Sequence, residues 1–305
     1  MEQADEASPA YWLARASYFT ERRLPDEVRA ALDRAMELSK GDWSSRHEGR
    51  LLRLHVLDRY ASWLAGQGEA GWRLYPPEFA TVAPDSPVAL GLARDLLTRA
   101  PKDHAQDAAA LVWPVIRSQP VWQHNVVDDM IGWVADSRRD VDAFWAEAEA
   151  LTVDSDPSRA WALGRVLERR RHPRASVVLR NALSRTEGGD WTLVSHDAER
   201  SCLRTGEWRA AEAILRKRHD RHGSVPDAHE PARLAAAAAQ VGDCDEAIRL
   251  WKEALNLDRS VGASIEPLLV AGLRQPLVDL YTRLASEDPA SVEVSRTLEY
   301  LRATK

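Results

Sequence analysis

The sequence predicts an all-α fold in which antiparallel helical hairpins stack into an α-α superhelix. The first observation is a 36-residue period, at which Ala175, Ala211 and Ala247 recur. A large apolar residue follows each alanine four positions later: Leu179, Leu215 and Trp251. Self-similarity at such a period is typical of stacked helical hairpins, each of which needs its neighbours to bury its apolar face. Composition agrees, because 45% hydrophobic and 29% charged residues is normal for a globular chain and too apolar for a disordered one.

The clearest copy of the repeat spans residues 234–259, LAAAAAQVGDCDEAIRLWKEALNLDR. Gly242 should end its first helix, because glycine tolerates the left-handed conformation that closes a helix. The second helix carries apolar residues three and four positions apart, which places them on one face. They are Ala247, Leu250, Trp251, Ala254, Leu255 and Leu257. We expect the two alanines to let helix backbones approach closely while Trp251 fills the adjacent gap.

This segment resembles a tetratricopeptide repeat (TPR). The second helix of that family follows the pattern small-x3-large-x2-small, which Ala247, Trp251 and Ala254 match here. The resemblance implies a TPR-like solenoid that acts as an interaction scaffold and has no activity of its own.

Weaker copies lie upstream. One period back, Gly206 takes the place of Gly242, but Arg218 stands where Ala254 does. We therefore expect this copy to open its packing at Arg218 or to end its helix early. Two periods back, Pro173 stands where a helix can begin. That copy keeps the small, large and small residues, which are Ala175, Leu179 and Ala182.

Both ends of the chain also predict helices. An N-terminal hairpin has apolar faces made by Trp12, Ala16 and Phe19, then by Val28, Leu32 and Ala35. A C-terminal helix has Leu277, Tyr281 and Leu284 on one face. Residues 290–305 could form a final helix that covers the last apolar face, as terminal caps of a repeat array must.

Between these ends the register is poor. We expect one long helix from Arg46 that ends at Gly66, and then an irregular stretch at 66–87 that cannot be helical through Pro76 and Pro77. Such a loop is either a functional flap or a boundary. We interpret it as a boundary or an insertion whose aromatic residues pin it to the helices; these are Trp72, Tyr75 and Phe79. Helices should follow near 87–100, 103–118, 120–136 and 139–152.

The chain is accordingly divided into four regions. Residues 1–65 form an N-terminal helical region with a degenerate repeat, and 66–87 form the loop or insertion. Residues 88–152 form helical hairpins of poor register, and 153–305 form TPR-like repeats with a C-terminal capping helix.

Charge is distributed unevenly. Residues 159–222 hold 15 Arg or Lys against eight Asp or Glu, a net charge of +7 in a chain whose net charge is −6. Such an asymmetry can steer an anionic partner. The dense basic clusters at 168–174 and 216–222 should lie in a turn within a hairpin and in a loop between hairpins, and so emerge at opposite edges. Because no stacking aromatic residues alternate with them, we do not expect nucleic acid as the partner.

No catalytic or metal-binding pattern stands out. Asp128 and Asp129 are interpreted as acids on a helix surface, since no third acid follows one turn later. His219, His222 and His229 are interpreted as loop histidines. The sequence has no glycine-rich phosphate loop and no nucleophile elbow. We therefore expect no enzyme activity, no metal and no cofactor.

The remaining residue types predict packing and location. Trp122 and Trp133 lie 11 residues apart and should share one core-facing helix face, and Cys202 and Cys244 should be reduced thiols at packing positions. No apolar run reaches the ~18 residues of a membrane span. The first ten residues lack a basic and then apolar segment, so we expect no secretory signal and a cytoplasmic location.

The candidate binding residues follow from the TPR resemblance, because in that family the first helix of each hairpin lines the concave surface. The register places His196, Arg200 and Arg204 there, four residues apart and hence on one face. The next hairpin would add His229 and Gln240. The family's carboxylate clamp uses Lys and Asn residues that are absent here, and an exposed arginine row that only solvates the helix is the alternative.

The sequence thus favours a non-enzymatic scaffold that binds a protein or an acidic peptide segment, as an adaptor or a regulator. Two alternatives stay open. One is an accessory or sensor domain of a larger enzyme or regulatory protein, and the other is an all-helical enzyme with an unrecognised site.

Overall fold

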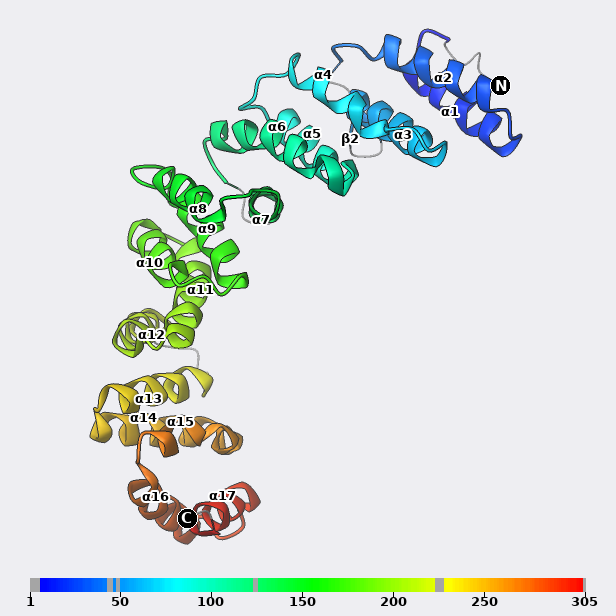
Figure 1. Cartoon of the computed structure of the whole chain (residues 1–305). Helices are drawn as coiled ribbons and strands as arrows, with labels where there is room; N and C mark the ends of the chain where they lie inside the picture. Colours follow the sequence, from blue (N-terminus) through cyan, green and yellow to red (C-terminus); the bar gives the residue numbers. More distant parts are fainter. Residues whose placement is uncertain (1–5, 43–45, 48–49, 123–125, 223–227, 304–305) are drawn as a thin grey trace. The chain divides into compact units, whose positions relative to one another are not determined.

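A computed structural model describes residues 6–42, 46–47, 50–122, 126–222 and 228–303. Over these residues the chain forms 17 α-helices, three short 3-10 helices and one antiparallel pair of two-residue strands (Figure 1). Consecutive helices pack against one another. The all-α prediction is confirmed. The chain divides into two compact units, Met1–Val166 (unit 1) and Leu167–Lys305 (unit 2).

Unit 1 begins with the expected hairpin of α1 (Pro9–Glu21) and α2 (Pro25–Leu38). Both helices begin at a proline, whose missing N–H is no loss in the first turn. The apolar faces of the two helices meet in a shared core with α3 (Leu52–Gly66). In this core, α1 and α2 contribute the buried residues Leu13, Ala16, Val28, Leu32 and Ala35.

The segment around α3 corrects two expectations. The long helix begins at Leu52 and not at Arg46, because β1 (Arg46–His47) and β2 (Arg50–Leu51) precede it, although it ends at Gly66 as predicted. The stretch that should have been irregular holds η1 (Gly71–Leu74) and α4 (Tyr75–Phe79). Pro76 and Pro77 lie in the first turn of α4, where proline is tolerated.

The aromatic residues of this stretch do pin it to the helices, since Trp72 and Tyr75 are buried and Phe79 is half-buried. A buried ion pair adds to this anchoring. Arg53 Nε of α3 lies 3.2 Å from Glu78 Oε2 of α4.

The rest of unit 1 consists of helices with short connections. They are α5 (Pro87–Arg99), η2 (Lys102–His104), α6 (Ala105–Ser118), α7 (Val127–Asp136), α8 (Val141–Ala150) and α9 (Pro157–Arg169), which runs across the division into unit 2.

The helix expected at 120–136 begins only at Val127. Trp122 precedes it, is fully buried and donates its indole N–H to the carbonyl oxygen of Ile116 at 2.9 Å. Trp133 lies on α7 and is 45% exposed. The expectation that these two tryptophans share a core-facing helix face is therefore wrong.

Unit 2 holds the repeats (Figure 1). Its elements are α10 (Ala175–Arg185), α11 (Asp190–Thr205), α12 (Trp208–His222), α13 (His229–Val241), α14 (Cys244–Leu257), η3 (Arg259–Ser264), α15 (Glu266–Val270), α16 (Arg274–Glu287) and α17 (Val292–Ala303).

Two hairpins of unit 2, α11/α12 and α13/α14, have the predicted turns. Gly206 and Gly242 end the first helices with φ of 75° and 90°, a conformation that favours glycine. The repeated small and large residues are all fully buried, as the register predicts: Ala175, Leu179, Ala211, Leu215, Ala247 and Trp251. α17 buries Val294, Leu298 and Leu301 in the core of unit 2 and so acts as the expected cap.

One packing expectation in unit 2 is wrong. α12 neither ends nor opens at Arg218 but continues to His222. The basic cluster at 216–222 consequently lies on a helix and not in a loop. Over the described residues, no helix is long and apolar enough to cross a membrane.

Candidate functional site

The predicted binding residues lie on α11 and α13, the first helices of two consecutive hairpins. Arg233 Nη1 of α13 lies 3.6 Å from Glu199 Oε1 of α11, so the two helices are side by side at this point. Residues of α11 and α13 can therefore contribute to one surface.

The row of His196, Arg200 and Arg204 lies on one side of α11, with the two arginines exposed and His196 half-buried. Arg204 forms two hydrogen bonds to Glu168 of α9, Nε to Oε1 and Nη2 to Oε2, each of 2.9 Å. Burial acts to raise the pKa of Glu168, but the bonds from Arg204 and the charges of Arg204 and Arg200 outweigh it, so this pKa is lowered. Arg204 is thus already held by an internal carboxylate.

Arg218 of α12 is the centre of a buried ion cluster that the sequence analysis missed. Its side chain is fully buried, and it donates from Nη2 to Glu199 of α11 and from Nε to Glu230 of α13. A buried guanidinium is tolerated only when it is paired and its hydrogen bonds are satisfied. The partners come from α11 and α13, so with Arg218 on α12 the cluster joins three helices.

His196 belongs to this cluster and not only to the exposed row. Arg218 Nη1 lies 3.0 Å from His196 Nδ1. Because a guanidinium can only donate, Nδ1 must accept, which makes the imidazole neutral with its proton on Nε2. Burial lowers the pKa of His196, and the charge of Arg218 lowers it further. His196 is therefore held by a contact inside the protein and is less available than Arg200 to a binding partner.

The other two predicted residues lie at opposite ends of α13. His229 is its exposed first residue, whereas Gln240 is close to its last turn. Eleven residues of helix separate them, about 16 Å along the axis. The side-chain amide of Gln240 donates to the carbonyl oxygen of Pro267 at 2.9 Å. Gln240 thus positions α15, and the five predicted residues do not form one compact site.

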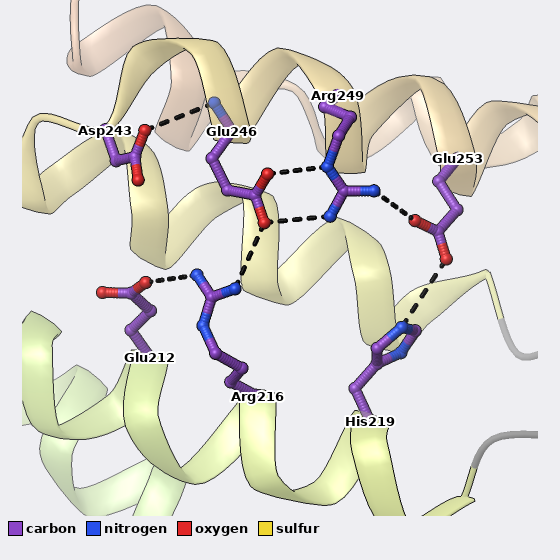
Figure 2. A network of polar contacts seen from close by, with 7 residues as sticks. All are labelled: Glu212, Arg216, His219, Asp243, Glu246, Arg249 and Glu253. Carbon is purple, nitrogen blue, oxygen red and sulfur yellow. Dashed lines mark hydrogen bonds and ion pairs between the residues drawn. The ribbon is translucent and has the colours of Figure 1, made fainter.

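A second charged network covers the neighbouring helices α12 and α14 (Figure 2). Arg216 bridges Glu212 at 2.8 Å and Glu246 at 3.2 Å, and Arg249 binds Glu246 through Nε at 2.6 Å. The hydrogen bonds from Arg249 lower the pKa of Glu246 to about 2. Basic residues of the 216–222 cluster are therefore paired with acids of the next hairpin.

The remaining candidate residues are placed as follows. Asp128 is buried and lies 3.6 Å from Arg165 Nε, so the interpretation of both aspartates as surface acids holds only for Asp129. His219 lies on α12 and not in a loop, and its Nε2 is 3.7 Å from Glu253 Oε1. In the part of the chain that the structure describes, no group of three or more His, Cys, Asp or Glu side chains is placed to hold a metal ion.

The two cysteines differ. Cys202 is buried on α11, where burial raises the pKa of its thiol to about 11. Cys244 is the exposed first residue of α14 and is not at a packing position, contrary to expectation.

The signal for the buried cluster was present in the sequence. Arg218 occupies a repeat position that requires a small buried residue. A charge at such a position implies acids on the flanking helices, but the sequence does not say which of the several glutamates supply the pair. No protein-family model matches the chain, and comparison with curated proteins gives no match.

Proposed function

We propose that the chain is a non-enzymatic scaffold of TPR-like hairpins, in which the surface of α11 and α13 binds an acidic segment of a protein partner. One observation carries the proposal. Arg200 and Arg204 are exposed on α11 and the half-buried Arg233 lies beside them on α13, while the fourth arginine, Arg218, is neutralised in the interior by Glu199 and Glu230.

Arg204 and Arg200 can bind a partner carboxylate in addition to the internal Glu168. In the ion pair between Arg204 and Glu168, the arginine side chain is 30% exposed and the glutamate side chain 15%, so the arginine is the more accessible partner. A partner carboxylate can bind Arg204 beside Glu168, because a guanidinium has five N–H donors and Glu168 accepts from two of them. Arg200, whose charge already acts on Glu168, lies one helical turn away.

The test is a titration of the full chain with a fluorescent Asp/Glu-rich peptide and a matched Asn/Gln-rich peptide. We expect binding of the acidic peptide alone, weakening as salt rises. The double change Arg200→Ala, Arg204→Ala should weaken binding while the chain stays folded, which circular dichroism would check.

The matched control removes the same charge from the network of Figure 2, through Arg216→Ala and Arg249→Ala. This variant should bind like the parent. Equal binding by the Arg200 and Arg204 variant at low and high salt would rule out this surface. The aromatic residues Trp72 and Tyr75 would not offer an alternative binding surface, since their side chains are buried.

A further inference from the structure

A cavity of about 280 Å³ lies between α5 and α7 in unit 1. Arg94, Leu97 and Thr98 line it from α5, at the i, i+3, i+4 spacing of one helix face. The other wall comes from α7 and the residue before it, again at the spacing of one face: Val126, Asp129, Met130 and Trp133. Two helix faces thus oppose each other across a gap that neither fills.

Part of the cavity lining is apolar, and it includes Leu97, Met130 and Trp133. Leu97 and Met130 are buried, whereas Trp133 is 45% exposed. An exposed tryptophan at a pocket is typical of binding sites, because its ring offers a large apolar area at low entropic cost. An apolar cavity of about 150 Å³ already holds a benzene molecule. This cavity can therefore take a branched or aromatic side chain.

Opposite charges line the same cavity from opposite helices. Arg94 has a side chain that is 51% exposed, and its Nε is 3.9 Å from Asp95 Oδ1. A guanidinium has five N–H donors, so this long contact leaves capacity for a carboxylate. Asp129 supplies a carboxylate on α7, with several lone pairs that can accept from an ammonium group as well as from its existing contacts.

We propose that this cavity binds an apolar amino acid in its zwitterionic form. The side chain lies against Leu97, Met130 and Trp133, the carboxylate binds Arg94, and the ammonium group binds Asp129. This inference does not depend on the acidic-segment surface of unit 2.

The pair of charges selects the ligand class. A simple carboxylic acid can bind Arg94 but brings an anion or an apolar group near Asp129. A simple amine can bind Asp129 but brings a cation or an apolar group near Arg94. A ligand that brings a like charge or an apolar group beside one of these charges is disfavoured. A zwitterion brings an opposite charge to both groups at once.

Calorimetric titration of the full chain with single compounds tests the proposal. L-leucine or L-phenylalanine should bind, and glycine should not, because it has no side chain for the cavity. N-acetyl-leucine and leucinamide, each lacking one of the two charges, should bind at least about 10-fold more weakly than leucine.

Two variants locate the site. Trp133→Ala and Arg94→Gln should each weaken binding of the amino acid about 10-fold or more. Asp136→Asn, which removes an exposed carboxylate from the same helix, should leave binding unchanged. Because Arg94 and Trp133 are both substantially exposed, the variants should keep the parent's melting temperature.

Three results would overturn the proposal. The first is no binding of either amino acid at about 10 mM. The second is binding that both variants retain, which would place the site elsewhere. The third is equal binding of leucine and its two derivatives, which would make the cavity a merely apolar one.

Discussion

The hairpins α11/α12 and α13/α14 share one register but fill one position differently. Ala254 lies at this position in α14 and is fully buried among apolar neighbours. Arg218 lies at the equivalent position in α12, is equally buried, and is held by Glu199, Glu230 and His196. The position is buried because of its place in the repeat. Which residue types can occupy it depends on the side chains that the neighbouring helices provide.

The two solutions differ in what stabilises them. The α13/α14 hairpin depends on shape, because small residues allow close approach and Trp251 fills the gap, with its indole N–H 3.3 Å from Tyr281 Oη. The α11/α12 hairpin depends on charge pairing, because a buried guanidinium without partners is strongly destabilising. Substitutions at equivalent positions should therefore have unequal effects.

The largest effect is expected when the charge is moved to the hairpin that lacks partners. Ala254→Arg buries an unpaired guanidinium in a closely packed site and should destabilise unit 2 by about 5 kcal/mol or more. Urea unfolding and hydrogen exchange of α13 and α14 would measure this change. A variant as stable as the parent would show that Ala254 is not buried in the repeat register.

Removal of one acid from the charged hairpin should have the next largest effect. Glu199→Gln leaves Arg218 without its buried carboxylate and should destabilise α11–α13 by about 3–5 kcal/mol. The matched control is Glu253→Gln on the exposed network, with an expected change of about 0–1 kcal/mol. Equal effects of the two variants would contradict a buried pair.

Overpacking of the apolar hairpin should be milder. Ala247→Phe inserts a ring at a fully buried position of α14 and should lower the free energy of unfolding of unit 2 by about 1–3 kcal/mol. The shift in the urea midpoint measures it. An unchanged urea midpoint would show that Ala247 does not lie at a close helix contact and that the repeat register is wrong.

The smallest expected effect is a pH dependence of stability in the α11/α12 hairpin that the α13/α14 hairpin lacks. His196 faces Glu199 on its own helix, Arg218 on α12 and Glu230 and Arg233 on α13. Since its pKa is lowered by burial and by Arg218, the unfolded chain binds this proton at higher pH than the folded chain does. Stability contributed by neutral His196 is therefore present above the ordinary histidine pKa near 6.5 and is lost as pH falls below it.

Hydrogen exchange of α11–α13 between about pH 7.5 and about pH 5, a range that includes the ordinary histidine pKa, would measure this loss. The variant His196→Gln should lose part of the pH dependence, while α14 should change little in either protein. A pH dependence identical in the parent and the variant would exclude His196 as its source.

Much of the fold could be predicted because repetition makes it visible. Ala175, Ala211 and Ala247 recur at one period, and Gly206 and Gly242 mark the turns. Where no period exists the prediction failed, as at Leu52, where α3 begins only after two short strands. Helix starts without a period depend on tertiary contacts, such as that between Arg53 and Glu78.

The candidate site was only partly predictable for a related reason. The four-residue spacing correctly places Arg200 and Arg204 on an exposed side of α11. It could not show that Arg218 turns inward, since its acids lie 19 and 12 residues away in sequence. It also could not show that Trp133 lines a cavity, because an apolar residue on a helix gives the same pattern whether its face is covered or not.

A double-mutant cycle between Arg218 and Glu199 tests the central claim most directly. Hydrogen exchange of α11–α13 would give the local stability of the parent, Arg218→Met, Glu199→Gln and the double variant. The account predicts that the double variant is more stable than the sum of the single losses implies, with a coupling of about 2 kcal/mol or more. Losses that add within about 0.5 kcal/mol would mean that the two side chains do not interact, and that the repeat position of Arg218 is not buried as described.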